Sequence, residues 1–124
     1  MLDTSPLTAV VERFADRLRA APQSRLQQGA AAVALELARE LSVRAQRLEG
    51  ASRLREMPDA GIFVVGDQVA VAGLDLAEAL RTAAEPQAGA AAGPRAGPDS
   101  AKAPSEILDE AVRLVERAEV RAMR

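Results

Sequence analysis

A long stripe of leucine and alanine side chains constrains the fold of this chain more than any other feature. The apolar residues recur every three or four positions, the spacing of one helix face; they are Leu26, Ala30, Val33, Leu37, Leu41, Ala45 and Leu48. Ser24 and Gln27 match the S-x-x-Q capping pattern that opens a helix. Because Gly50 follows the last leucine of the stripe, we expect a helix from Ser24 to Leu48, with residues 49–57 as an extension or a bend.

A second amphipathic helix is predicted near the start of the chain. It begins at Ser5 and Pro6, a pair that suits the first turn of a helix, and it ends before Pro22. One side carries Leu7, Val10, Val11, Phe14 and Leu18. Only Pro22 and Gln23 separate this helix from the one that starts at Ser24, so we expect the two to be antiparallel or steeply crossed neighbours.

Residues 61–73 carry the pattern of a β-hairpin. Two runs rich in β-branched residues flank Gly66 and Asp67, which suit a two-residue turn. One face of this hairpin would present Ile62, Val64, Val69 and Val71. A further capping pattern after the hairpin predicts a short helix over residues 75–84.

The last part of the chain reads as a linker followed by a helix. Residues 85–104 are mainly Pro, Gly and Ala, a composition that buries little apolar area and predicts a disordered linker. Ser105 can cap a final helix, whose apolar side carries Ile107, Leu108, Ala111, Leu114, Val115 and Ala118. Such a tethered helix can dock on its own core or on a partner protein.

These elements together predict a mainly α fold. It would contain a helical hairpin with one long helix, a single β-hairpin, a short helix, and a C-terminal helix tethered by a disordered linker. We divide the chain into a core domain over residues 5–84, the linker over residues 85–104 and the C-terminal amphipathic helix over residues 105–124.

The composition argues against enzyme chemistry. The chain has no His and no Cys, so the commonest general base, the commonest transition-metal ligand and a thiol nucleophile are all missing. Glu36 and Glu40 have the one-turn spacing of a di-metal site in a helical bundle, but such sites also use Glu-x-x-His pairs. We interpret both as solvated helix charge, and we predict no catalytic residue, no metal and no cofactor.

Nucleic acid and membranes are not expected as partners. The net charge is −2, too balanced for a phosphate-binding surface, and no apolar run is long enough to span a membrane. The order helix, turn, helix and hairpin is also that of a winged helix, with Arg44, Arg47 and Arg55 loosely clustered, although Asp67 at the hairpin tip has the wrong sign. A winged-helix DNA-binding regulator therefore stays an alternative. No signal-peptide pattern is visible, which favours the cytoplasm.

Residues 61–76 resemble the central hairpin of the small gas-vesicle shell proteins and their minor relatives. The resemblance rests on Gly61, the two valine-rich runs and the helix entry Leu74-Asp75-Leu76. It implies that the chain could be a structural or assembly protein whose copies associate edge to edge into a rib. We keep this family as a second alternative.

Our main functional prediction is a non-enzymatic oligomerisation, scaffold or adaptor protein. We expect a homo-oligomer, with a dimer favoured, and a C-terminal helix that serves as an arm for a protein partner. The predicted interface residues are Leu26, Val33, Leu37, Leu41, Leu48, Ile62, Val64, Val69, Val71, Ile107, Leu108, Leu114 and Val115.

Overall fold

The computed structural model describes residues 2–85 and 102–124, and these residues form four long helices. Two short helical segments, α2 and η1, lead directly into the second long helix. The elements in chain order are α1 (Ser5–Ala20), α2 (Gln23–Arg25), η1 (Leu26–Ala30), α3 (Ala31–Leu48), α4 (Val65–Ala84) and α5 (Pro104–Met123). The mainly α class is thus confirmed, while the described residues contain no strand.

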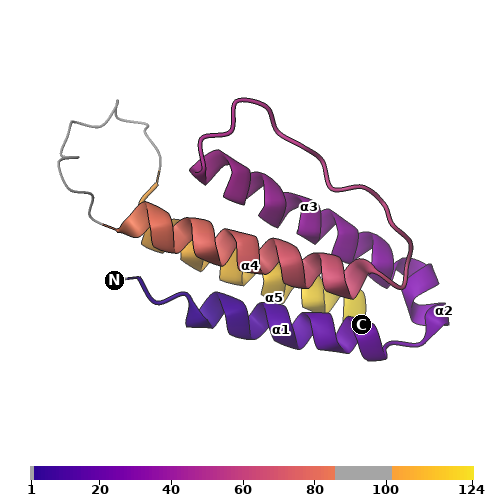
Figure 1. Ribbon diagram of the computed structural model, residues 1–124. Coiled ribbons are helices and arrows are strands. Elements are labelled where there is room, and N and C mark those ends of the chain that lie inside the picture. The colour runs from indigo at the N-terminus through magenta and orange to yellow at the C-terminus, as the bar shows by residue number, and fades with distance from the viewer. Residues whose placement is uncertain (1, 86–101) are drawn as a thin grey trace.

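The four long helices form a bundle in which α4 and α5 lie between α1 and α3. Figure 1 shows α1 and α5 running in one direction and α3 and α4 in the other. Helix α4 packs against all three of the other long helices, whereas α1 and α3 make almost no direct contact. The prediction that the first two helices are neighbours is therefore wrong: their directions are opposed, but they occupy a diagonal of the bundle.

Residues 49–64 connect α3 to α4, and we call this segment the crossover. Because α3 and α4 are parallel, the chain must return along the whole bundle before α4 can begin, as in other bundles with a long connection. Figure 1 shows the crossover arching along α3 from one end of the bundle to the other.

The predicted N-terminal helix is confirmed as α1. Its five predicted apolar residues are all buried, and Phe14 and Leu7 are fully enclosed. Pro6 lies in the first turn, where its missing N–H leaves no helical hydrogen bond unmade. Hydrogen bonding by the side chain and the backbone of Ser5 lowers the pKa of Asp3, whose carboxylate accepts from the Ser5 N–H (3.0 Å).

The predicted long helix ends at Leu48, as expected, but it is kinked near its start and is not one continuous helix from Ser24. It ends at Leu48 with a Schellman motif, in which Gly50 adopts φ 77° and the Ala51 N–H donates to the carbonyl of Gln46. Gly50 therefore terminates the helix, which settles the choice between an extension and a bend. A kink that we did not predict lies at Gly29, with φ 144°.

The predicted β-hairpin is wrong, because α4 begins at Val65 and runs through both the expected turn and the second expected strand. Residues 75–84, predicted as a separate short helix, are its second half. The helical pattern is present in the sequence, since the fully or nearly fully buried residues fall four, three, four and four positions apart: Val65, Val69, Ala72, Leu76 and Leu80. The strand signal came from valine, a residue that also occurs in buried helices.

Gly66, which was expected in a hairpin turn, and Gly73 both lie at the contact between α4 and α1. A β-carbon on Gly73 would lie 2.5 Å from Cγ1 of Val11, and one on Gly66 would lie 3.1 Å from the carbonyl oxygen of Ala15. Both glycines therefore allow α1 to approach α4 closely. The segment that resembles the gas-vesicle hairpin is a turn and a helix here. The same residues would have formed the wing of a winged helix, so that wing is not present either. The family resemblance itself stays an untested prediction.

The C-terminal helix docks on the core of its own chain. Its buried residues face α1, α3 and α4; they are Leu108, Ala111, Val115, Ala118, Glu119 and Ala122. The side chain of Glu106 accepts a hydrogen bond from the Ala103 N–H and completes the first turn (3.0 Å). Most of the predicted linker, residues 86–101, lies outside the described residues.

Ion pairs join α5 to α1 on one side and to α3 on the other. The buried carboxylate of Glu119 accepts hydrogen bonds from Arg13 (2.8 Å) and Arg17 (2.9 Å) of α1. Burial of this carboxyl group raises its pKa, but the two guanidinium groups outweigh burial, so the pKa of Glu119 is lowered. On the other side, Glu110 accepts from Arg44 of α3 (3.0 Å) and from Lys102, which lower the pKa of Glu110.

Candidate functional site

The structure distributes the predicted interface residues between the core and the surface. Six are buried in the bundle: Leu26, Leu37, Leu41, Val69, Leu108 and Val115. Five are half-buried: Val33, Leu48, Ile62, Ile107 and Leu114. Only Val64 and Val71 are exposed. The predicted helix seam therefore lies mainly inside this chain, and the four residues of the predicted hairpin face do not share a face, since Val69 points inward on α4.

An exposed apolar stripe does occur on α4 and the residue pair before it. We call Phe63, Val64, Val71 and Leu74 the α4 stripe; their exposed fractions are 70%, 37%, 53% and 53%. Val64, Val71 and Leu74 are seven and three positions apart, which places them on one side of the helix. Sequence reasoning missed Phe63 and Leu74 in this role because it assigned the segment a period of two.

Charged residues lie about one turn to either side of Val71 and Leu74, the two stripe residues within α4. Asp67 accepts a hydrogen bond from Arg19 of α1 (2.7 Å), and this contact raises the pKa of Arg19. Glu78 accepts from Arg81 (2.6 Å), whose second terminal nitrogen donates to the hydroxyl of Thr4 (2.7 Å). Val71 and Leu74 are therefore flanked along the helix by a carboxylate–guanidinium pair on each side, and Asp67 separates them from Phe63 and Val64.

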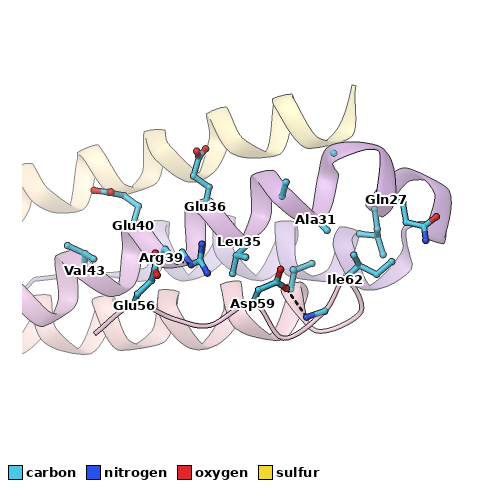
Figure 2. A pocket seen from close by; sticks show the side chains of 15 residues that line it. Gln27, Ala31, Leu35, Glu36, Arg39, Glu40, Val43, Glu56, Asp59 and Ile62 are labelled. Atoms are coloured by element: carbon cyan, nitrogen blue, oxygen red, sulfur yellow. Dashed lines mark hydrogen bonds and ion pairs between the residues drawn. The ribbon is translucent and has the colours of Figure 1, made fainter. Parts of the chain in front are cut away.

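A second surface feature is a cleft of about 760 Å³ between α3 and the crossover. We call it the α3 cleft. Its floor is apolar and includes Leu35 and Val43 of α3, with Ile62 and Val65 on the opposite wall. Small residues at one end of α3, Ala31 and Ala32 beside Gly29, leave room there. Figure 2 shows Leu35 and Ile62 on opposite sides of the opening.

Three hydrogen-bonded contacts hold the crossover in place beside the cleft. The side-chain amide of Gln46 both donates to the carbonyl of Arg55 (2.9 Å) and accepts from its N–H (2.7 Å). Arg39 donates to the carbonyl of Met57 (2.7 Å), and Gln68 of α4 donates to the carbonyl of Pro58 (2.8 Å). These contacts fix the backbone that forms one edge of the cleft.

Carboxylates line both edges of the α3 cleft. Figure 2 shows Glu36 and Glu40 on the edge toward α5, Glu56 and Asp59 on the crossover edge, and Arg39 between them. Arg39 is the single cation in this lining, so the lining residues carry a net charge of −3, from four carboxylates and one guanidinium group. From the sequence, Glu36 and Glu40 were interpreted only as solvated charges on a helix. The position of the crossover, which completes the cleft, could not be predicted from the sequence.

The two surfaces are thus an exposed apolar stripe and a cleft with an apolar floor and acidic edges. In the described ranges, no three carboxylates gather closely enough to hold a metal ion. Within the same ranges, none of the helices combines the length and the hydropathy that a bilayer crossing requires. Comparison of the chain with protein-family models, curated proteins and solved structures finds no significant match.

Proposed function

We propose that the protein is a non-enzymatic helical adaptor of the cytoplasm that works as a homodimer, with the α4 stripe as the contact between its subunits. The single observation that carries the proposal is the position of the stripe: four of the six exposed large apolar side chains of the described residues gather on and just before one helix. Such a grouping is typical of an interaction surface rather than of scattered exposure. The absence of His and Cys favours a binding role over catalysis.

The α4 stripe suits a symmetric contact between two copies of the helix. In an antiparallel arrangement, a two-fold axis between Val71 and Leu74 places Val71 of one subunit against Leu74 of the partner subunit. The exposed apolar side chains near the middle of the helix then cover each other. Helices that pack in this way approach to about 8–10 Å between their axes.

The charges beside the stripe are complementary under the same symmetry. Asp67 and Glu78 are equally distant from the axis, so the pair formed by Asp67 and Arg19 meets the pair formed by Glu78 and Arg81 of the partner subunit. Each carboxylate then lies near two guanidinium groups, so that the two carboxylates that face each other are both compensated by arginine. The arrangement is neutral at each end of the contact.

The expected affinity is modest. Val71 and Leu74, the stripe residues that this arrangement covers, are already partly buried, so full burial contributes about 1 kcal/mol per side chain, or roughly 4 kcal/mol for two subunits. Loss of translational and rotational freedom costs about 4–15 kcal/mol. We therefore expect a dimer whose population rises with concentration.

Sedimentation equilibrium of the full chain over a hundredfold range of concentration tests this proposal. We expect a monomer–dimer equilibrium for the native chain and a monomer for Leu74→Glu. Val120→Glu is the matched control, because Val120 of α5 is also an exposed apolar residue (58%) but lies outside the stripe; this variant should still dimerise. A native chain that is monomeric throughout, or a Leu74→Glu variant that dimerises like the native chain, overturns the proposal.

A further inference from the structure

The outer side of α3 is a helix face that no other helix of the described chain covers. Helix α3 packs against α4 and α5, while the residues that line the cleft fall three and four positions apart along its remaining side. They are Ala32, Leu35, Glu36, Arg39, Glu40 and Val43. From Ala31 to Val43 this side is roughly 18 Å long, at 1.5 Å of rise per residue.

This length and the apolar floor suit a helical segment of a partner protein. A groove of roughly 18 Å matches about three turns of a helix, which would place aliphatic side chains at helical spacing into the floor. Leu35 and Val43 from α3, with Ile62 from the crossover, supply the apolar contacts, and the small Ala31 and Ala32 give space for a bulky side chain.

The charge of the cleft decides which kind of helix it would accept. Glu56 lies 3.7 Å from Arg39 and its side chain is 74% exposed, so it keeps most of its capacity to bind a second cation. Asp59 accepts a hydrogen bond only from the Gly61 N–H within the described residues. A partner with basic residues on both flanks of its apolar stripe would meet carboxylates on both edges of the cleft.

Two nearby cations already contact the edge that faces α5. Glu40 pairs with Arg44 (2.8 Å), and Glu36 pairs with Arg121 of α5 at 3.4 Å, with both members of the second pair more than half exposed. Exposed pairs of this kind contribute little to stability, so a partner cation can replace Arg121 at Glu36 at small cost. Helix α5 itself shows that Glu36 and the neighbouring face of α3 accept an arginine-bearing amphipathic helix.

We propose that the α3 cleft binds a basic amphipathic helix of a partner protein, with its aliphatic side chains on the cleft floor and its Arg or Lys side chains between the two acidic edges. This site is separate from the α4 stripe. It assigns the protein a binding partner of defined chemistry in addition to its second subunit.

Fluorescence anisotropy with labelled helical peptides tests the proposal. The probes are designed peptides with leucine at helical spacing and arginine on both flanks, made in several registers, and matched peptides with glutamate in place of arginine. We expect the full chain to bind at least one arginine peptide, with affinity that falls as salt is added, and to bind none of the glutamate peptides. Failure to bind any arginine peptide overturns the proposal.

Variants locate the binding site. Glu36→Lys combined with Glu56→Lys should weaken binding about tenfold or more, since it reverses one charge on each edge, and Ala32→Trp should abolish binding by filling the cleft. Glu116→Lys combined with Glu12→Lys is the control with the same change in net charge, on exposed positions that do not line the cleft. If this control weakens binding as much as the cleft variant does, the peptide is attracted by the net charge of the protein and not by the cleft, and the proposal fails.

The dimer and the cleft can be tested apart. Leu74→Glu should remain able to bind the arginine peptide, because residue 74 does not line the cleft. Amide chemical-shift changes on peptide binding should fall on residues 26–43 and 56–65. Changes confined to α1 and α5 would place the peptide elsewhere and overturn the proposed site.

Discussion

A β-carbon added to Gly73 would lie 2.5 Å from Cγ1 of Val11, well inside the contact distance of two carbon atoms. Gly73 is therefore a contact residue between α1 and α4, and the absence of its side chain sets how closely the two helices pack. The bundle depends on a glycine in the middle of its most connected helix.

Replacing this glycine should destabilise the protein although alanine is the better helix former. Gly73→Ala gains about 1 kcal/mol in helix propensity, but the forced separation of α1 and α4 costs about 1–3 kcal/mol. We expect a net loss in the free energy of unfolding, measured by urea denaturation. In a chain that already carries Val11→Ala, Gly73→Ala should cost much less, because the clashing methyl groups are gone. If the losses in the free energy of unfolding from the two substitutions simply add, residues 11 and 73 are not in the contact described.

The register of α4 can be tested with one substitution at two positions. Val69 is fully buried and Val71 is 53% exposed, whereas the hairpin pattern would place both on one face. Val69→Ala should lower the free energy of unfolding by about 1–3 kcal/mol, and Val71→Ala should leave the monomer unchanged or slightly more stable because alanine favours helix. Equal losses at the two positions would contradict the helical register. The comparison is made at concentrations where the chain is monomeric.

The C-terminal ends of α1 and α3 were predictable from sequence because local chemistry determines them. Gly50 ends α3 through its own positive φ angle, and Pro22 ends the first helix through its ring. Neither outcome depends on residues far away in the sequence. For the same reason, the apolar sides of α1, α3 and α5 could be identified from spacing alone.

The hairpin error has a physical cause that sequence alone does not reveal. Gly66 and Gly73 are turn signals if the chain is considered locally, and they become packing residues only when Val11 and Ala15 lie against them. The α3 cleft could not be predicted from sequence for a similar reason. Glu36 and Glu56 come to lie on opposite edges of one cleft only after the crossover has returned along the bundle.

The interaction of Glu119 with α1 should make stability dependent on pH. The pKa of Glu119 is lower in the folded chain than in the unfolded chain. The contribution of Glu119 to the free energy of unfolding is therefore complete at pH values above its pKa in the unfolded chain, about 4.3. It is lost as the pH falls through the lower pKa that Glu119 has in the folded chain. Glu119→Gln should cost about 1–3 kcal/mol at neutral pH.

Urea denaturation at neutral and acidic pH checks this expectation. The difference between the native chain and Glu119→Gln should shrink below about pH 4. Glu116→Gln, an exposed position on the same helix, should cost little at either pH. A Glu119→Gln difference that is the same at both pH values would show that the ionised carboxylate is not what holds α5 to α1.

The contact between Gln46 and the crossover should control its accessibility to protease. Gln46→Ala removes both hydrogen bonds to the backbone of Arg55, and Arg53 and Arg55 are exposed sites for trypsin. Cleavage there should become several times faster. Gln28→Ala, at an exposed glutamine of η1 that does not line the cleft beside the crossover, should leave the rate unchanged.

The diagonal placement of α1 and α3 has a consequence for how the chain folds. Helices α1 and α3 do not pack side by side although a short connection joins them, and α3 contacts its parallel neighbour α4 only after the crossover closes a long loop. No helical hairpin closed by a short turn therefore forms within the described residues, and the partners of α1 are α4 and α5, which are distant from it in sequence. We expect assembly in one concerted step, slower than that of a bundle built from successive hairpins, and no stable half of the molecule on either side of residues 49–64.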